Sequence, residues 1–450
     1  MTGPHRRGGG RVHVVGAGLA GLAAAVRLAE AGRPIVLYEA GPQAGGRCRS
    51  YLDAELGVRI DNGNHLLLSG NRAAVEYVRR IGAGDTFHPA GEPAIPFVDL
   101  ADGARWSVRP TRGRLSLWLL DPARRIPGTR ARDYLAAIRL WRGGLRGTVA
   151  EALPPGSVLY RRLWQPLTVA ALNTAAEQAS ARLLWRVLAE TLGRGAAACR
   201  PLLPRDGLSE SLVDPALAFL ARHGAEIRFG IRLRALDFAG ERVAGLALEA
   251  GTVRLAAEDA VILAVPPTVA ARLVPGLVVP DDFAPIVNAH FRRAAPAGAP
   301  AFVGIVGGTA EWVFVKREVI SVTVSAADRL VDRPATELAA SLWHDVARTL
   351  GIPADPLPPA RIVKERRATF RATPVQVARR PPSATRWNNL HLAGDYVDTG
   401  LPGTIEGAIR SGFAAAARLG RRGPAAAANP MPEPVSRSAT PIEDRQRALP

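Results

Sequence analysis

The sequence predicts an α/β fold in which a discontinuous, Rossmann-like dinucleotide-binding domain carries an inserted α+β domain. Three stretches support this prediction: a strand, glycine turn and helix within 11–47, an apolar strand at 261–265, and a strand that ends in an acid at 391–395. Short, continuously apolar strands are typical of a parallel sheet that is buried on both faces. Because these stretches lie far apart in the chain, insertions must separate them.

The first stretch, RVHVVGAGLAGLAAAVRLAEAGRPIVLYEAGPQAGGR, places three glycines in the order G-x-G-x-x-G after an apolar run. Gly16 permits a tight turn, Gly18 lets backbone approach a pyrophosphate, and Gly21 lets the helix lie close to the strand. The helix that starts at Leu19 and Ala20 offers N–H groups and its positive dipole end to an anion. This order predicts a dinucleotide site; the alternative is a glycine-rich turn without a ligand.

The next predicted strand, 35–38, ends at an acid. Glu39, with Ala40 beside it, follows Gly21 at close to the spacing of about 20 residues expected for the carboxylate that binds a ribose hydroxyl. A carboxylate there would repel a 2′-phosphate. The pattern therefore favours an adenosine that lacks this phosphate.

Two further glycines and an arginine favour FAD over NAD. Gly45, Gly46 and Arg47 come shortly after Glu39. Two small residues and a fixed cation could meet the same pyrophosphate from a second side, a contact that NAD-binding domains do not need. Arg47 could equally be a solvated arginine at the start of a helix. We expect FAD as the cofactor of the Rossmann-like domain.

Composition limits the class of protein. The 450 residues carry a formal net charge of +18, and all but two of the 58 basic residues are arginine. Such charge alone suggests nucleic acid or an anionic membrane. No recognised nucleic-acid-binding module accompanies the charge, so we expect no nucleic-acid partner. Residues 294–310 come closest to a membrane-spanning run and are better explained as loop and strand.

Cysteine and histidine usage predicts a cytoplasmic protein without a metal site. Cys48 and Cys199 have no C-x-x-C spacing and cannot form a disulfide framework, which fits a reducing compartment. The eight histidines show no metal-ligand spacing. The first apolar run is too short, and too soon a strand, to be a signal peptide.

The segment 105–147 is basic and aromatic. Its arginines, set against Asp121 and Asp133, are Arg105, Arg109, Arg112, Arg114, Arg124, Arg125, Arg130, Arg132, Arg139, Arg142 and Arg146. The large apolar residues interleaved with them include Trp106, Leu115, Trp118, Leu119, Leu120, Tyr134, Leu140 and Trp141. Arginine with half-buried tryptophan suits a lipid headgroup boundary. The segment predicts either a partner in an anionic membrane surface, on the inner face of the cytoplasmic membrane, or a surface helical lid.

Polar residues precede an apolar run at 61–68. The cluster DNGNH includes Gly63, Asn64 and His65, and Leu66 to Leu68 follow it. So many hydrogen-bonding groups before an apolar run predict a site wall. A turn whose side chains cap their own backbone explains them equally well.

The middle of the chain alternates between helical and extended patterns. Helical periodicity covers 157–199, with a kink or boundary at Pro166. Glu177 follows an apolar stripe there and could be a substrate-side acid or part of a solvated helix cap. Further predicted elements are a helix at 208–223, one strand at 225–236, a meander at 243–255, strands near 301–306, 312–315, 319–324 and 361–371, and a helix at 335–350.

The last ordered stretch completes the predicted site. Gly394 and Asp395 end a strand, and a helix begins after Gly403 with Thr404 and Ile405. Glycine lets backbone come close to a ring system. A helix N-terminus presents donors to a flavin, which becomes anionic on reduction.

These patterns divide the chain into four parts. The FAD-binding domain is expected to comprise 11–70, 205–268 and 385–420. A helical lid or substrate region would span 71–204, a mixed-sheet substrate domain 269–384, and a disordered tail 421–450, which is rich in Pro, Ala and Arg.

Four motifs in this order resemble the FAD-binding segments of the amine oxidase and phytoene desaturase superfamily. They are the glycine fingerprint, GGR at 45–47, ILAVPP at 262–267 and LAGDYVDTGLPGTIEGAIRSG at 392–412. Within this superfamily, DNGNHLLLSGN, LWQPLTVAALNTAAEQAS, LLPRDGLSESLVDPALAFL and DTGLPGTIEGA are similar to segments of the hydroxysqualene dehydroxylase family.

The resemblance implies that hydroxysqualene is reduced to squalene with hydride from reduced FAD, in squalene and hopanoid synthesis. It implies that Glu39 holds the adenosine ribose and that Arg47 serves the pyrophosphate side. It also implies that Asp395 serves the pyrophosphate or ribityl chain and that backbone near Leu233 serves the adenine. Where the family commonly carries Gln, this chain has the shorter Asn64, so a contact there with flavin or substrate would be weakened or moved. FAD should be non-covalent because no cysteine lies near the terminal motif.

The chemistry needs an acid and a source of electrons. His65 and Glu177 are the candidate acids that would help the hydroxyl leave as water. The sequence shows no second dinucleotide fingerprint, so an external reductase or carrier must reduce the flavin. A carotenoid-type or phytoene-type desaturase, which runs electrons the other way, remains the main alternative. A flavin amine oxidase and a non-enzymatic FAD-bearing membrane scaffold are further alternatives.

Overall fold

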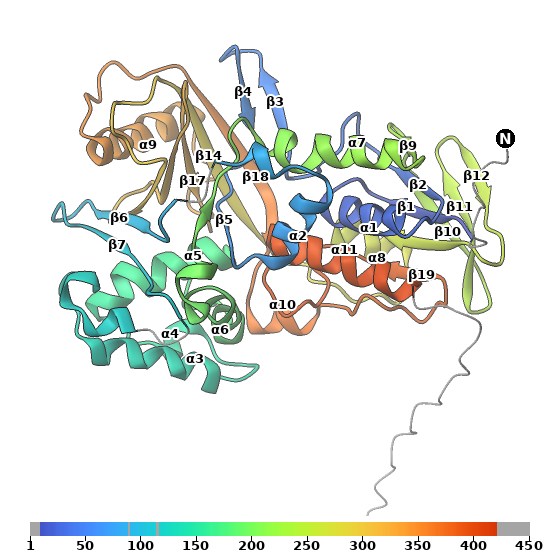
Figure 1. The fold of residues 1–450 in the computed structure, drawn as a ribbon, viewed down its shortest axis with the longest axis horizontal. Coiled ribbons are helices and arrows are strands. Elements are labelled where there is room, and N and C mark those ends of the chain that lie inside the picture. The colour runs from blue at the N-terminus through green and yellow to red at the C-terminus, as the bar shows by residue number, and fades with distance from the viewer. Residues whose placement is uncertain (1–9, 89–90, 114–116, 421–450) are drawn as a thin grey trace, which may run out of the picture.

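The computed structural model describes residues 10–88, 91–113 and 117–420. Figure 1 shows an elongated molecule, with a parallel sheet and its covering helices at one end. A mixed sheet and a group of short helices lie at the other end, one above the other. The predicted tail 421–450 lies outside the described residues, and so do Arg114 and Leu115 of the basic, aromatic segment.

The parallel sheet gathers strands from distant parts of the chain. Its order is β19-β13-β1-β2-β9, and every pairing is parallel. The strands are β1 (Val12–Val15), β2 (Ile35–Tyr38), β9 (Glu226–Arg228), β13 (Ala260–Leu263) and β19 (Leu390–Leu392). The covering helices include α1 (Leu19–Glu30), α7 (Asp214–Arg222) and α11 (Ile405–Gly420). The predicted α/β, Rossmann-like architecture is confirmed.

A small antiparallel sheet follows β9 and corrects one prediction. Residues 225–236 were expected to form one strand, but they form β9 and the start of β10 (Leu233–Ala239), which belong to different sheets. The chain turns at Gly230, which has φ +69. β10 then pairs with β11 (Arg242–Leu248), and β11 with β12 (Gly251–Arg254), as the predicted meander. The alternation of apolar and polar residues in 225–236 did not show that the chain passes from one sheet to another there.

The mixed sheet has seven strands in the order β18-β14-β17-β16-β15-β6-β7. They are β6 (Ile95–Asp99), β7 (Arg105–Val108), β14 (Phe283–Arg292), β15 (Phe302–Val306), β16 (Trp312–Val315), β17 (Val319–Val324) and β18 (Ala360–Phe370). Helix α9 (Ala335–Leu350) packs its apolar side on one face of this sheet. The β6–β7 hairpin belongs to 71–204, the region where helical structure was expected. It joins the mixed sheet because Gly304 to Val306 of β15 pair in parallel with β6.

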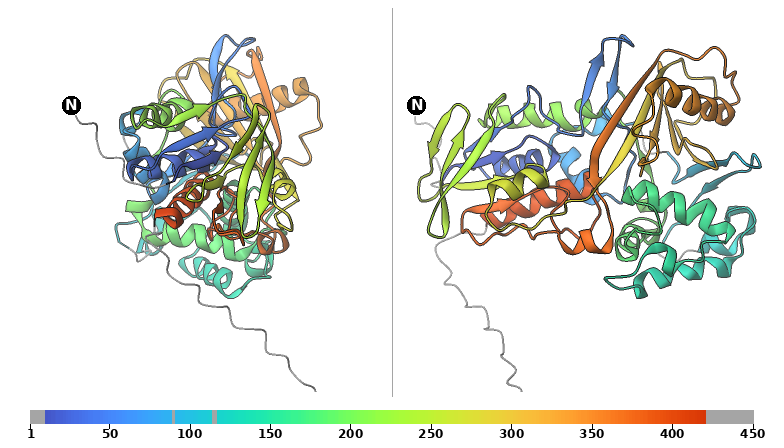
Figure 2. Two further views of the ribbon diagram at one scale, coloured as in Figure 1. Left: turned by 90° about the vertical axis from the view of Figure 1, so that its right-hand side faces the viewer. Right: turned by 180° about the vertical axis from the view of Figure 1, so that it is seen from behind.

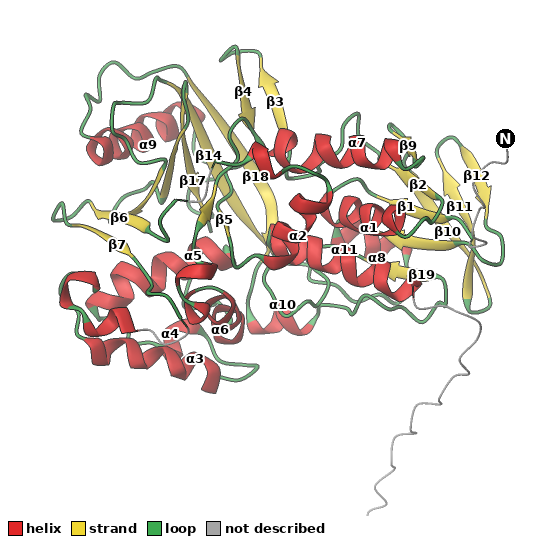
Figure 3. Cartoon of the chain, in the orientation of Figure 1, coloured by secondary structure: helices red, strands yellow, loops and turns green. Residues whose placement is uncertain are grey.

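The lid helices lie beside the mixed sheet (Figures 2 and 3). They are α3 (Ile138–Arg142), α4 (Val149–Ala152), α5 (Gln165–Leu172) and α6 (Ala181–Glu190), preceded by 3-10 turns η2 (Leu117–Leu120), η3 (Pro122–Arg124) and η4 (Ala131–Ala137). A π-helical turn, η5 (Tyr160–Trp164), ends where α5 begins, so the boundary predicted at Pro166 is confirmed. Among the residues of the three described ranges, no helix combines the length and apolarity needed to cross a bilayer.

Shorter elements complete the description. They are β3 (Ser50–Asp53), β4 (Val58–Asp61), β5 (Leu67–Leu68), α2 (Arg72–Arg80), η1 (Gly84–Thr86), η6 (Leu192–Arg194), η7 (Ala196–Ala198), β8 (Pro201–Leu202), η8 (Ser209–Val213), α8 (Pro267–Leu273) and α10 (Pro374–Ala378). The β3–β4 hairpin projects from the body in Figure 1.

Several residues of the basic, aromatic segment are core residues. Trp106, Trp118, Tyr134 and Leu140 are buried, which contradicts their expected place at a headgroup boundary. Trp106 stacks on Phe97, and Trp118 meets Tyr134 edge-on. One ring pair lies within the β6–β7 hairpin and the other within the lid, so the exposed part of the segment is smaller than its sequence indicated.

Candidate active site

The glycine turn after β1 is built as the fingerprint predicts. Gly16 has φ +103, and a Cβ there would lie 2.4 Å from the carbonyl oxygen of Ala264. A Cβ at Gly21 would lie 1.9 Å from the carbonyl oxygen of Gly16. A Cβ at Gly18 would meet no atom within 4 Å. Two glycines therefore allow close packing, and the third faces open space in front of the α1 N-terminus.

The predicted ribose acid stands beside this turn. Glu39 follows β2, and its two carboxylate oxygens accept the N–H groups of Ala17 and Gly41, each at 2.8 Å. The backbone N–H of Ile231 donates to the carbonyl oxygen of Glu39 at 2.9 Å. This bond brings the start of β10, with Leu233, to the same end of the sheet. Ala40 is exposed next to Glu39.

The second glycine pair lies against the first. The N–H of Gly45 donates to the carbonyl oxygen of Ala17 at 2.8 Å, and Gly45 forms a bridge with Gly18. A Cβ at Gly46 would approach only the Cα of Gly18, at 3.5 Å. Two separate glycine segments thus border one open space, as predicted.

An ion pair joins the two ends of the chain at this space. Arg47 Nη2 donates to Asp395 Oδ1 at 2.7 Å, and Nη1 donates to the carbonyl oxygen of Ala368. The Asp395 side chain is buried, whereas that of Arg47 is about half exposed. The neighbouring carboxylate raises the pKa of Arg47. The sequence placed both residues near the cofactor but did not show that they pair.

The start of α11 completes the border. A Cβ at Gly403 would lie 3.1 Å from Asp395 Oδ2 and 3.2 Å from Thr369 Cβ, so a larger residue there would require these neighbours to shift. Thr404 caps the helix by accepting the N–H of Gly407 at 3.1 Å, and Ile405 packs into the core. The N–H of Gly394 donates to Ser411 Oγ at 2.8 Å, which ties β19 to α11.

The residues around this space fit FAD. The space is bordered by the glycines, by the N-terminal amides of α1, which no side chain caps, and by the Arg47 guanidinium, all suited to a pyrophosphate. A carboxylate, Glu39, stands where a ribose would need an acceptor. The residues around this space therefore suit a dinucleotide cofactor, and their contacts with it stay a prediction.

The predicted wall residues Gly63, Asn64 and His65 face the mixed sheet. Asn64 Nδ2 donates to Thr323 Oγ1 at 3.2 Å, and Thr323 in turn donates to Asn288 at 2.7 Å. A Cβ at Gly63 would lie 3.2 Å from Asn288 Nδ2. The shorter Asn64 therefore belongs to a side-chain network between the FAD-binding domain and β14 and β17.

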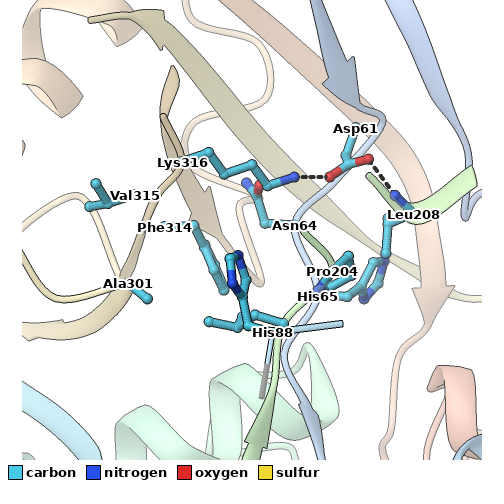
Figure 4. A pocket seen from close by; sticks show the side chains of 11 residues that line it. Asp61, Asn64, His65, His88, Pro204, Leu208, Ala301, Phe314, Val315 and Lys316 are labelled. Atoms are coloured by element: carbon cyan, nitrogen blue, oxygen red, sulfur yellow. Dashed lines mark hydrogen bonds and ion pairs between the residues drawn. The ribbon is translucent and has the colours of Figure 1, made fainter. Parts of the chain in front are cut away.

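A small pocket of mixed polarity opens beside this network (Figure 4). Its lining includes Asn64, His65, His88, Phe314 and Lys316. It has room for water-sized molecules next to the site.

One ion pair crosses this pocket. Lys316 Nζ donates to Asp61 Oδ2 at 2.6 Å, and Asp61 Oδ1 accepts from Ser50 Oγ and from the N–H of Leu208 (Figure 4). Burial acts to raise the pKa of Asp61, but Lys316 and these hydrogen bonds outweigh it and lower the pKa. Asp61 is therefore a structural carboxylate that stays ionised.

Neither predicted acid has the surroundings of a proton donor. Burial lowers the pKa of His65 to about 4, so its imidazole is neutral near pH 7 and carries no spare proton in the imidazolium form. Glu177 is exposed, and the Tyr160 hydroxyl donates to it at 3.4 Å. The catalytic role assigned to each residue stays a prediction.

Two further residues of this region, Arg380 and Glu406, were not predicted from the sequence. Arg380 is buried and donates to the carbonyl oxygens of Asp395, Tyr396, Val397 and Leu401, which fixes the loop before α11. Glu406 is buried in the first turn of α11 and accepts the N–H groups of Ala73 and Ala74. The sequence around Arg380 and Glu406 gave no indication that these two charged side chains are buried.

The parallel sheet, the double glycine border, the acid after β2 and the closing helix together define an FAD-dependent oxidoreductase. A model of the flavin-containing amine oxidoreductase family matches residues 19–420. The protein is 51% identical to a hydroxysqualene dehydroxylase of Rhodopseudomonas palustris, over 90% of this chain and 97% of the relative. It is 47% identical to the protein of that name from Sinorhizobium fredii, with the same coverage. The chain therefore belongs to the flavin-containing amine oxidoreductases and, within them, to the hydroxysqualene dehydroxylase family.

Solved structures agree on the fold. A cyclohexylamine oxidase from Brevibacterium oxydans superimposes with a TM-score of 0.67 at 16% identity, over 92% of this chain and 99% of the other. A putrescine oxidase superimposes with a TM-score of 0.64 at 18% identity, with the same coverage.

Proposed function

We propose that this protein removes the hydroxyl group of hydroxysqualene reductively and releases squalene. The observation that carries the proposal is the near full-length similarity to proteins named hydroxysqualene dehydroxylase. The site supports it, because the space between the glycine segments and α11 accommodates FAD and the lid lies beside the mixed sheet.

The chemistry follows from the balance of the reaction. An alcohol R–OH takes up one proton and one hydride and becomes R–H and water. Reduced FAD supplies the hydride when bound. The residues of this chain must bind the hydrocarbon, exclude bulk water from the cation that forms when the carbon–oxygen bond breaks, and deliver the proton to the leaving oxygen. Lid helices α5 and α6 bring apolar side chains to the core beside the mixed sheet.

An external reductase or electron carrier completes the proposed cycle. The one dinucleotide border in the described ranges is the FAD site, and the sequence carries no second fingerprint. Reduced nicotinamide therefore has no built site of its own here. We propose that a separate protein reduces the flavin.

The purified protein, reduced anaerobically with dithionite, should convert hydroxysqualene to squalene, with one product formed per flavin. Mass spectrometry identifies the product, and the return of the yellow flavin spectrum reports the electron transfer. NADPH alone should support only slow turnover until a reductase is added. A reduced protein that leaves hydroxysqualene unchanged would contradict the proposal. Squalene that instead loses hydrogen to the oxidised protein would indicate a desaturase.

We further propose that the lid binds an anionic membrane surface, from which the hydrocarbon would enter. Leu135, Ile138, Trp141 and Leu145, here termed the apolar stripe, are between 50% and 71% exposed. Leu135 in η4 and Ile138 and Trp141 in α3 recur every three residues, which places them near one side of these helices. Leu145 follows in the turn after α3. Exposed arginines, including Arg132, Arg139, Arg142 and Arg146, flank the stripe. Apolar and cationic side chains together complement anionic headgroups.

The protein should co-sediment with vesicles that contain phosphatidylglycerol at low salt, and less so at high salt, because salt screens the arginines. The double variant Leu135→Glu, Trp141→Glu should lose most of this binding. The matched control Val278→Glu, Val375→Glu places the same charges at exposed apolar positions elsewhere and should bind as the unmodified protein does. A lack of binding to anionic vesicles at low salt, or equal binding of both double variants, would contradict the proposal.

A further inference from the structure

One face of the mixed sheet carries a row of polar side chains, here termed the polar face. It consists of Asn288 and His290 of β14 and Ser321 and Thr323 of β17, all of which are buried. Asn288 lies opposite Thr323, and His290 lies opposite Ser321, and each pair shares a hydrogen bond. The alternate residues of both strands pack in the apolar core with α9. The polar face is therefore the side of the sheet that α9 does not cover.

Hydrogen bonds fix which atom of Asn64 meets this face. Asn288 Nδ2 donates to the carbonyl oxygen of Asn62 at 3.4 Å, so Asn288 Oδ1 is left to accept the proton of Thr323 Oγ1. Because a hydroxyl has one proton, Thr323 Oγ1 acts as the acceptor toward Asn64, whose Nδ2 donates to it at 3.2 Å. In the described part of the chain, no residue donates a hydrogen bond to Asn64 Oδ1. This oxygen remains available as an acceptor.

Asn64 and its neighbour His65 both line the small pocket of Figure 4. His65 keeps some accessible surface, and its ring makes no hydrogen bond to any residue of the described ranges. A neutral imidazole has one N–H donor to offer. Lys316 and Asp61 also line the pocket, but their charges offset each other in an ion pair. His88 is exposed, so water competes for its ring. The pocket therefore offers one neutral acceptor and one neutral donor.

The rest of the lining is largely apolar. It includes Leu203, Leu208 and Phe314. Phe314 lies opposite Ser321 in the register of β16 and β17, so its ring belongs to the same side of the sheet as the polar face. The room in the pocket suits a group of the size of water. A hydroxyl group has this size, both donates and accepts a hydrogen bond, and would bring its neighbouring carbon atoms against the apolar walls.

The pocket lies next to the border of the predicted FAD site. Asn62 Nδ2 donates to the carbonyl oxygen of Arg47 at 3.4 Å, and Arg47 pairs with Asp395. Burial lowers the pKa of His65, and the Arg47 guanidinium adds to this effect, so the two side chains lie within electrostatic reach of each other. The segment 62–65 therefore leads from the predicted cofactor border to the pocket.

We propose that this pocket is the subsite for the hydroxyl group of the substrate, with Asn64 Oδ1 as the acceptor of its proton and the His65 ring N–H as the donor to its oxygen. The inference rests on the proposed function and deepens it. The hydroxyl is the polar group of a substrate that is otherwise hydrocarbon, so these two hydrogen bonds select the carbon that lies beside the cofactor. The water that forms when the carbon–oxygen bond breaks fits the same room. Thr323 is a positioning residue, because it orients Asn64.

The test compares the binding of hydroxysqualene and squalene to the oxidised holoenzyme, followed by the change in the flavin absorption spectrum. The unmodified protein should bind the alcohol more tightly. Asn64→Leu and His65→Leu should each weaken the binding of hydroxysqualene about 5- to 10-fold, since each removes one hydrogen bond, and should leave that of squalene unchanged. His65→Gln keeps an N–H donor and should retain most of the preference. The matched controls Asn388→Leu and His344→Leu change exposed residues outside the pocket lining and should retain all of it.

An unchanged preference in both Asn64→Leu and His65→Leu would overturn the inference and leave the proposed function intact. An equal loss of affinity for the two ligands would overturn it as well, because it would mark these residues as merely structural. If a variant failed to fold or to hold FAD, the unmodified holoenzyme would still decide, since equal affinities for alcohol and hydrocarbon contradict a hydroxyl subsite. No squalene from the unmodified reduced enzyme would instead remove the proposed function, and the inference with it.

Discussion

Replacing Gly18 with valine should give a folded protein that binds no FAD. Gly18 has ordinary extended backbone angles, with φ −71 and ψ 172, so valine causes no strain. A Cβ there meets no protein atom within 4 Å. The added methyl groups would instead occupy the space in front of the α1 N-terminus, where the pyrophosphate must approach the amides. Purified protein should be colourless, with an unchanged far-ultraviolet circular dichroism spectrum.

Gly84→Val is the matched control, because Gly84 is exposed and a Cβ there also has no neighbour within 4 Å. It should remain yellow. Gly21→Val should behave differently from both, since its Cβ would overlap the carbonyl oxygen of Gly16 and push α1 from the sheet. Full FAD occupancy in Gly18→Val would show that the cofactor does not use this turn.

The strands and helices that lie next to glycines or consist of continuous apolar runs could be predicted from the sequence. β1, β13 and α9 agree closely with their predicted ranges, because a buried parallel strand or an amphipathic helix imposes its own local pattern. β14 was missed, although it is ten residues long. Its polar residues Asn288 and His290 face the network with Thr323 and Ser321, so its sequence lacks the pattern of a half-buried strand.

The parts of the site that could not be predicted depend on contacts between distant residues. Arg47 and Asp395 were each expected at the cofactor, but only the fold shows that the Arg47 guanidinium forms an ion pair with the Asp395 carboxylate. Trp106 was misplaced because exposure of an aromatic side chain depends on its neighbours, here Phe97 and Arg162.

Asn173→Ala should lower the free energy of unfolding by about 4 kcal/mol. Three hydrogen bonds to Ala326, Ala284 and Thr369 would be lost at about 1 kcal/mol each. Alanine in the left-handed region costs about 1 kcal/mol more. Urea unfolding of the holoprotein measures the loss, and the exposed Asn388→Ala should stay within about 0.5 kcal/mol of the unmodified protein.

Asn173→Gly separates the two causes, because glycine adopts φ +46 freely but makes none of the three bonds. It should be more stable than Asn173→Ala by about 1 kcal/mol, and still about 3 kcal/mol less stable than the unmodified protein. If glycine restored full stability, backbone strain alone would account for Asn173, and its side chain would not hold the turn. If both variants matched the unmodified protein, α5 would not depend on its contacts with β14 and β18. The left-handed turn at Ala326 would then be held by other parts of the sheet.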